Sequence, residues 1–139
     1  MIGVGVLVWR DRQLLLGKRI MQQQNNCWQF PGGHLEHGES VIECAAREVL
    51  QETGLRVKAL RHLGFTDKTF AMGRQSYISL LVSCVHDSGE LKTLEPDKCE
   101  CWQWFDYQQL PSPLFKPIEI FLSQQSDLYQ LHQASVCLA

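Results

Sequence analysis

The sequence predicts an α+β domain in which strands and helices pack in layers around one core. Strand-like runs lie on both sides of an early helical segment at residues 40–54, and a second helical pattern follows at residues 114–123. The 139 residues suffice to bury a core in one domain. We therefore expect a single domain over residues 1–139, without an internal repeat.

The composition is typical of a water-soluble globular protein. Hydrophobic residues make up 45% of the chain and charged ones 20%, and no apolar run reaches the roughly 20 residues that span a bilayer. A net charge of −2 argues against a broad surface for a nucleic acid polymer, but it is compatible with a small nucleotide that brings its own metal. The apolar first nine residues lack a basic leader, so we interpret them as a strand rather than a signal peptide.

The six cysteines do not form a metal-binding pattern. No C-x2-C pair occurs, and Cys99 and Cys101 form a C-x-C without a matching second pair. Cys44 lies within the predicted helix, where a small buried thiol is the usual case. We expect reduced, structural cysteines and a cytoplasmic protein.

The chain opens with a predicted β-hairpin. Residues 2–9 and 14–19 have the aliphatic content of strands, and the polar residues 10–13 between them are typical of a turn. The second strand ends in Gly17, Lys18 and Arg19. This positive end is either solvated or binds phosphate, for which the planar guanidinium of Arg19 is well suited.

A polar loop at residues 21–26 leads to a short predicted strand at residues 27–30, which Pro31, Gly32 and Gly33 end. Trp28 in this strand either packs in the core or stacks on the base of a bound nucleotide.

The helix at residues 40–54 has clear local signals at both ends. Ser40 followed by Glu43 forms a capping box at its start, and Gly54 supplies its end. Apolar residues at spacings of three and four predict a buried side, which consists of Ile42, Ala45, Ala46, Val49 and Leu50.

The same helix carries Glu48 and Glu52 four residues apart, with Gln51 beside them, so like charges share one face. One interpretation is a solvated face on which Arg47 pairs with Glu43 or Glu39. The other is a set of oxygen ligands for Mg²⁺ or Mn²⁺. The glycine-rich loop just before the helix favours the metal, because it lets a backbone carbonyl and a phosphate approach the ion.

The remaining elements follow from alternation, apolar runs and turn residues. We expect strands at 56–65, 75–85 and 102–105, a connector at 66–74, turns at 86–89 and 106–110, a helix at 114–123 and a flexible tail from about residue 124. The strand at 75–85 is the longest, and its continuous apolar run predicts burial on both faces.

The segment from Gly33 to Leu55 resembles the signature of the Nudix hydrolases, G-x5-E-x7-R-E-U-x-E-E-x-G-U, where U is a bulky aliphatic residue. The fixed positions are occupied here by Gly33, Glu39, Arg47, Glu48, Val49, Glu52, Gly54 and Leu55. The one departure is Gln51, which stands where the first of the two adjacent glutamates is expected. The resemblance extends over about residues 1–123.

The resemblance implies an α/β/α sandwich with a mixed central sheet and hydrolysis of a nucleoside diphosphate linked to another group. Glu48 and Glu52 are then the direct Mg²⁺ ligands, helped by Gln51 and by the backbone carbonyl of Gly32 or Gly33. Arg47 holds Glu48 and Glu39 in place. Because an amide offers one neutral oxygen, Gln51 predicts a weakened metal site and a higher metal demand.

The resemblance also assigns substrate contacts and one further acid. It implies that Arg19 faces the substrate phosphates and that the loop at Gly33 lies close to them. A further carboxylate, as metal ligand or general base, is expected from the acidic stretch before the strand at 102–105; Glu100 is the first choice and Glu95 the second.

The substrate indicated is a nucleoside triphosphate, cleaved to a monophosphate and pyrophosphate. Short length, the G-K-R strand end, the F-P-G-G-H loop and the tryptophan-bearing strand after E-P-x-K are similar to MutT-like enzymes. The alternatives are an ADP-ribose or other NDP-X pyrophosphatase and a non-catalytic nucleotide-binding domain. The partner expected is a small nucleotide rather than a membrane or a nucleic acid polymer, and the sequence leaves monomer and homodimer open.

Overall fold

The computed structural model describes residues 2–20, 26–66, 70–72, 75–125 and 127–137. Within them the elements are β1 (Ile2–Arg10), β2 (Gln13–Arg19), β3 (Trp28–Gln29), β4 (Gly32–His34), α1 (Val41–Thr53), β5 (Arg56–Phe65), β6 (Phe70–Met72), β7 (Gln75–Ser88), β8 (Cys99–Asp106), α2 (Lys116–Ser123) and α3 (Leu128–Cys137).

The strands form a mixed sheet whose main path runs β3-β2-β1-β7-β5. β1 and β7 pair in parallel from Ile2 opposite Ile78 to Trp9 opposite Val85. The other pairings are antiparallel: β4 joins β1, β8 joins β2, and β6 folds back on β7. The expected mixed sheet is therefore confirmed.

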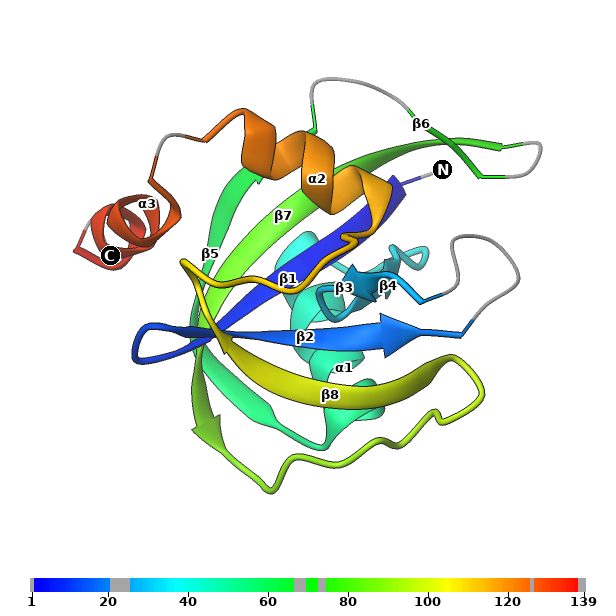
Figure 1. Ribbon diagram of the computed structural model, residues 1–139, viewed down its shortest axis with the longest axis horizontal. Coiled ribbons are helices and arrows are strands. Elements are labelled where there is room, and N and C mark those ends of the chain that lie inside the picture. The colour runs from blue at the N-terminus through cyan, green and yellow to red at the C-terminus, as the bar shows by residue number, and fades with distance from the viewer. Residues whose placement is uncertain (1, 21–25, 67–69, 73–74, 126, 138–139) are drawn as a thin grey trace.

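Helices cover both faces of this sheet, α1 behind it and α2 in front of it in the view of Figure 1. Alternation along β1 explains how one strand serves two layers. Val4, Val6 and Val8 pack in the cluster that includes residues of α1, whereas Leu7 and Trp9 pack in the cluster of α2 and α3. The molecule is thus an α/β/α sandwich with a core on each side of the sheet.

Helix α1 begins and ends where its local signals place it. The Ser40 hydroxyl accepts a hydrogen bond from the Glu43 N–H, and the Glu43 carboxylate accepts one from the Ser40 N–H, both at 3.0 Å. Gly54 closes the helix in the left-handed region with φ 76°. The capping box and the glycine stop are both confirmed.

The buried side of α1 differs from the expected one. Ala45 and Val49 are buried as predicted, but Leu50 is 38% exposed, and Ile42 and Ala46 are only partly buried. The buried side instead extends to Cys44, Glu52 and Thr53. It turns toward Glu52 because residues after β7 cover the end of the helix: the Lys92 and Leu94 N–H groups donate to the carbonyls of residues 53 and 52.

Several segments form strands or helices where the sequence indicated loops. Gly32–His34 pairs with β1 although Pro31 and the glycines predicted a break. Phe70–Met72 forms β6 inside the expected connector, and β7 continues through the predicted turn to Ser88. The tail that was expected to be flexible contains α3. The loop predicted at residues 21–26 lies outside the described residues apart from Asn26.

Aromatic contacts hold α3 against the sheet. The His132 ring stacks on Trp9 with 4.5 Å between centroids, and its Nδ1 lies 3.0 Å from the Ser83 hydroxyl on β7. Tyr129 stacks on Tyr107, and the Arg12 guanidinium lies over both tyrosine rings. The C-terminal helix is therefore part of the second core.

The described cysteines Cys27, Cys44, Cys84, Cys99 and Cys101 are free thiols. Cys44 is fully buried in α1, as predicted. Among the described helices, none combines the length and apolar character of a membrane span.

Candidate active site

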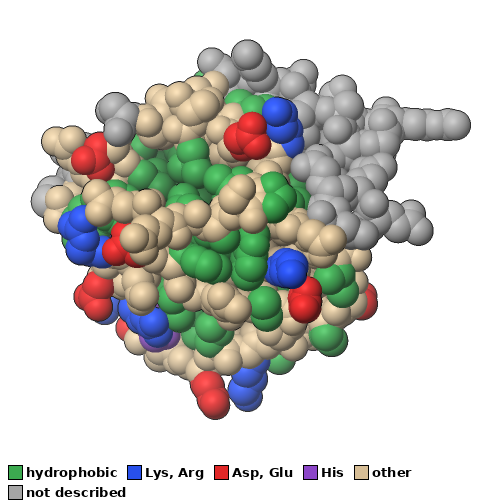
Figure 2. Space-filling view, in the orientation of Figure 1, with side chains coloured by type: hydrophobic (Ala, Val, Ile, Leu, Met, Phe, Trp, Pro, Cys, Tyr) green, Lys and Arg blue, Asp and Glu red, His purple; other side chains and the backbone are tan. Residues whose placement is uncertain are grey.

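A cavity of about 670 Å³ opens between α1, β1, β4, the start of β8 and α2. Its polar end holds the acids Glu36, Glu48, Glu52 and Glu95, and Gln51. Its apolar end is formed by Phe30, Leu81, Phe115, Pro117 and Ile118. Figure 2 shows hydrophobic side chains gathered over the middle of the face that carries α2, with charged ones around them. The cavity can therefore hold an elongated ligand with one anionic and one apolar end.

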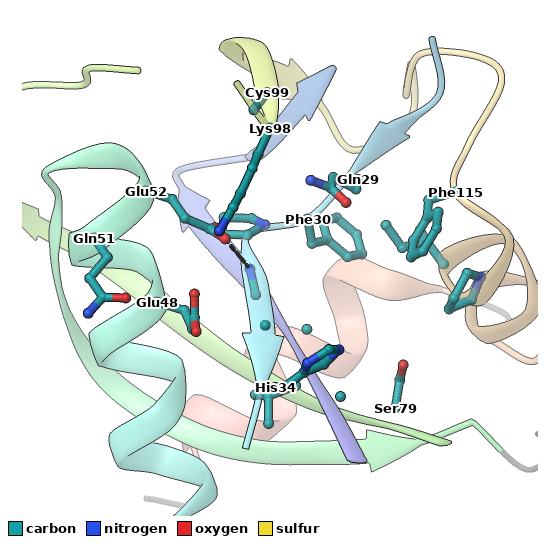
Figure 3. A pocket seen from close by; sticks show the side chains of 18 of the residues that line it. Gln29, Phe30, His34, Glu48, Gln51, Glu52, Ser79, Lys98, Cys99 and Phe115 are labelled. Atoms are coloured by element: carbon teal, nitrogen blue, oxygen red, sulfur yellow. Dashed lines mark hydrogen bonds between the residues drawn. The ribbon is translucent and has the colours of Figure 1, made fainter. Parts of the chain in front are cut away.

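Glu48 and Glu52 project from α1 toward the short strand β4 (Figure 3). Glu52 is 8% exposed, and its carboxylate accepts a hydrogen bond from the Gly32 N–H at 3.2 Å. The approach is close at both glycines: a Cβ added at Gly33 would lie 2.4 Å from Glu48 Oε1, and one at Gly32 would lie 2.0 Å from the Val4 carbonyl oxygen. At position 32 only glycine lets β4 lie this close to the backbone of β1, and a side chain at position 33 would displace the Glu48 carboxylate.

The electrostatics of this pair are unfavourable without a cation. The pKa of Glu52 is raised to about 9, chiefly by burial and also by the nearby Glu48 and Glu95, while the hydrogen bond from Gly32 opposes the rise. Burial also raises the pKa of Glu48, which the neighbouring Arg47 partly offsets. Two carboxylates held together out of water are a poor core but a good place for a divalent cation.

Arg47 organises the acids around it. Its Nε and Nη2 donate to the two carboxylate oxygens of Glu39 at 3.0 and 2.7 Å, and its Nη1 donates to Glu48 at 2.8 Å. The hydrogen bonds from Arg47 lower the pKa of Glu39 to about 2. The alternative of a merely solvated face does not describe this network, because Arg47 and Glu48 keep only 23% and 13% side-chain exposure.

Gln51 belongs to the same network but lies at its edge. The residue is exposed, it lines the cavity, and its Oε1 accepts a hydrogen bond from Arg47 Nη1 at 3.2 Å. The amide oxygen, the only acceptor atom of this side chain, is therefore already in contact with Arg47. This is consistent with a weaker contribution to a metal than a carboxylate would make.

The donor set fits Mg²⁺ or Mn²⁺ in part. Among the described residues, no three His, Cys, Asp or Glu side chains converge as a ready ligand set. Mg²⁺ commonly takes one or two protein carboxylates and completes its shell with water and substrate phosphate oxygens. Glu48 and Glu52 are the two carboxylates available for that role, and their binding of a metal stays a prediction. The contributions of Gln51 and of a carbonyl from Gly32 or Gly33 stay predictions.

Arg19 lies inside the cavity but is already engaged. It is 6% exposed, donates to the Gln29 side chain and lies over the Phe115 ring, 4.1 Å from its centroid. Burial lowers its pKa. Arg19 therefore joins the polar wall at Gln29 to the apolar end of the cavity at α2.

Two predicted site residues lie outside the cavity lining. Trp28 packs edge-on against Phe105, with 5.0 Å between centroids, which favours the core interpretation; base stacking by Trp28 stays a prediction. Glu100 is exposed and pairs with Lys18 at 3.7 Å. The second choice, Glu95, lines the cavity instead. Glu95 is therefore nearer to the other acids, and the role of either residue stays a prediction.

Lys98 and Phe115 were not identified from sequence, and both line the cavity. Lys98 Nζ lies 3.7 Å from Glu95 Oε2, and the side chain extends toward Glu52 in Figure 3. The sequence could have indicated Lys98, because it follows Glu95 by three residues in the same acidic stretch. Phe115 had only helical spacing, which does not distinguish a cavity wall from a core.

Comparison with known proteins gives a family match over most of the chain. Residues 1–125 match the NUDIX domain. The NAD-capped RNA hydrolase NudC of Vibrio parahaemolyticus is 34% identical over 108 residues, which are 76% of this chain but 38% of that protein. The ADP-ribose pyrophosphatase of Methanocaldococcus jannaschii is 32% identical over 114 residues, 82% of this chain and 66% of that protein. The chain therefore spans well under half the length of the first relative.

Solved structures agree on the architecture. A MutT NUDIX hydrolase from Burkholderia pseudomallei superposes with a TM-score of 0.81 at 30% identity, covering 90% of this chain and 97% of that one. A UDP-X diphosphatase superposes with a TM-score of 0.71 at 25% identity, covering 96% of this chain and 63% of that one. These neighbours share the mixed sheet between helices that is described above.

Proposed function

The chain belongs to the Nudix family, and from this premise we propose that it hydrolyses a phosphoric anhydride bond in a nucleoside diphosphate joined to a second group. An ADP-ribose pyrophosphatase and a NAD-capped RNA hydrolase among its relatives, and a UDP-X diphosphatase among similar structures, support substrates of this kind. These names favour an ADP-ribose or other NDP-X substrate, which the sequence left as an alternative. They favour it over the nucleoside triphosphate that the sequence indicated first.

The observation that carries the proposal is the buried pair Glu48 and Glu52 facing the glycines of β4. Bound between them, Mg²⁺ or Mn²⁺ would neutralise phosphate charge and lower the pKa of a bound water. The protein supplies the two carboxylates, and Arg47 fixes the orientation of Glu48 through its hydrogen bond at 2.8 Å. Glu95, which comes from the segment between β7 and β8, is the candidate for the further acid.

The apolar end of the cavity could bind the nucleoside part of such a substrate. Phe30, Phe115 and Ile118 offer surface to a base, while Gln29 and Ser79 offer hydrogen-bonding groups beside it. A nucleoside diphosphate that spans the cavity would place its anhydride bond near the acids and its base near α2.

Hydrolysis of a nucleoside triphosphate is the second candidate. One observation favours it: the MutT NUDIX hydrolase structure matches this chain over 97% of its own length at 30% identity. Gln51 keeps a third possibility in view, a domain that binds nucleotides without cleaving them, although Glu48 and Glu52 are retained.

One substrate panel separates these functions. Purified protein with Mg²⁺ would be incubated with ADP-ribose, NAD, a UDP-sugar, the common dNTPs and an oxidised dNTP. AMP with ribose phosphate from ADP-ribose supports the proposal, and pyrophosphate release from dNTPs alone supports the second candidate. Nucleotide binding without any product would leave only the binding domain.

The proposed partner is a small nucleotide. Because some relatives are named for NAD-capped RNA, a short RNA with a 5′ NAD cap belongs in the same panel. The cytoplasmic location, and the choice between monomer and homodimer, stay predictions.

A further inference from the structure

We propose that Lys98 binds the phosphate groups of the substrate, an inference that rests on the proposed function. Lys98 enters the cavity from the segment between β7 and β8, opposite the α1 acids (Figure 3).

The other lysine and arginine residues of the described cavity lining are committed elsewhere. Arg47 donates to Glu39, Glu48 and Gln51. Arg19 is buried, donates to Gln29 and lies over the Phe115 ring. A phosphate that enters the polar end would meet these cations already neutralised or covered, whereas the Lys98 side chain is 57% exposed.

The backbone fixes the base of the Lys98 side chain while its end stays adjustable. The Lys98 N–H donates to the Glu95 carbonyl at 2.9 Å, and its carbonyl accepts from the Ile20 N–H at 3.3 Å. The same segment is attached to α1, because the Leu94 N–H donates to the Glu52 carbonyl at 3.1 Å. The ammonium group is thus held on the wall that faces Glu52, on a flexible stem.

The present partner of Lys98 can be exchanged for a phosphate. Its ion pair with Glu95 is 3.7 Å long and partly solvated, and such pairs are weak. A diphosphate carries two negative charges where Glu95 carries one, and an ammonium group can donate hydrogen bonds to it from many directions, unlike the fixed fork of a guanidinium. Lys98 also counters the repulsion that Glu48, Glu52 and Glu95 exert on an incoming polyphosphate.

The test compares Lys98→Met with Lys58→Met. Lys58 on β5 is the matched control, since its side chain is 60% exposed, it pairs with Asp87 at 3.7 Å, and it lies outside the cavity lining. With ADP-ribose and saturating Mg²⁺, we expect Lys98→Met to raise KM about tenfold with kcat changed less than about threefold. The control should stay within about twofold of the parent, and Lys98→Arg should recover most of the loss.

A second measurement needs no catalysis. In EDTA, calorimetry with AMP and with adenosine separates binding of the phosphate from binding of the nucleoside. Lys98→Met should weaken AMP binding several-fold and leave adenosine binding unchanged. The affinity of the parent for AMP should also fall more steeply with NaCl than that of the variant.

Equal KM and equal AMP affinity in Lys98→Met and Lys58→Met would overturn the inference. So would Glu95→Gln combined with Lys98→Met restoring the parent KM, because Lys98 would then serve only to neutralise Glu95. Failure of the proposed function looks different, since the parent itself would then cleave no member of the panel. The AMP measurement still decides the role of Lys98 in that case.

Discussion

Glu39 and Arg47 meet in a two-point contact, with Nε to Oε2 at 3.0 Å and Nη2 to Oε1 at 2.7 Å, although Glu39 precedes α1. The remaining guanidinium nitrogen donates to Glu48 at 2.8 Å. The loop before the helix therefore fixes the orientation of Glu48 through one planar side chain.

Arg47→Lys should test that arrangement. A lysine keeps the charge but cannot donate in parallel to Glu39 and also reach Glu48, so kcat should fall about tenfold or more. Arg56→Lys on β5, an exposed position, is the matched control. Steady-state kinetics on the best substrate of the panel measure the effect, and an active Arg47→Lys enzyme would show that Glu48 needs no such support.

Glu52→Gln should separate stability from activity. Since the pKa of Glu52 in the folded protein is about 9 and the ordinary value for Glu is about 4.3, the folded state retains a proton between these values that the unfolded state has released. Stability of the metal-free protein therefore falls as pH rises through this window. The uncharged amide removes that dependence and should add on the order of 2 kcal/mol to the free energy of unfolding at pH 8, while hydrolysis is lost.

Urea unfolding in EDTA between pH 5 and pH 9 checks this sign. The parent should lose stability relative to Glu52→Gln as the pH rises, and Mg²⁺ should stabilise the parent only. The exposed Glu90→Gln is the control for removing one carboxylate. Parallel pH profiles for parent and variant would mean that Glu52 is not strained by its burial.

Gln51→Glu should lower the Mg²⁺ concentration needed for half-maximal turnover several-fold. The new carboxylate adds a charged oxygen at the cavity edge beside Arg47, 3.2 Å from the present amide oxygen. Turnover at saturating Mg²⁺ should change little, because Glu48 and Glu52 are unaltered. An unchanged Mg²⁺ titration would show that position 51 does not take part in the metal site.

Glu95→Gln and Glu100→Gln form a matched pair in one segment. Glu95 lines the cavity and Glu100 pairs with Lys18 outside it, so only the first should reduce kcat, by about tenfold or more. Glu100→Gln should stay within about twofold of the parent. The reverse result would restore the preference that the sequence suggested.

Local signals predicted local structure well. The capping box of Ser40 and Glu43 and the stop at Gly54 lie within a turn of the ends that they define, so α1 is where the sequence places it. The layered fold followed for the same reason, because strand and helix patterns are each contained in one segment. The acids on α1 were likewise brought together by helical spacing alone.

The sequence alone does not show what contacts between distant segments decide. Gly32–His34 is a strand because β1 offers a partner, and nothing in its own residues indicates that. Glu100 lies where the pairing of β2 with β8 changes register, between Arg19 opposite Cys99 and Gly17 opposite Trp102. Such an irregularity re-aims a side chain, which sequence spacing cannot show. Leu50 is exposed for a similar reason, since the segment after β7 covers the neighbouring side of α1 instead.

Because Gly32 lies against the Val4 carbonyl, a library of random replacements would lose variants at positions 32 and 52 for different reasons. At position 32 any side chain collides with the main chain of β1, so variants would be removed at the level of soluble yield. At position 52 the glutamine variant would remain soluble, even with a higher yield, and would be lost only in a selection for nucleotide hydrolysis. Comparing the residues tolerated at positions 32 and 52 would therefore separate what the fold requires from what hydrolysis requires.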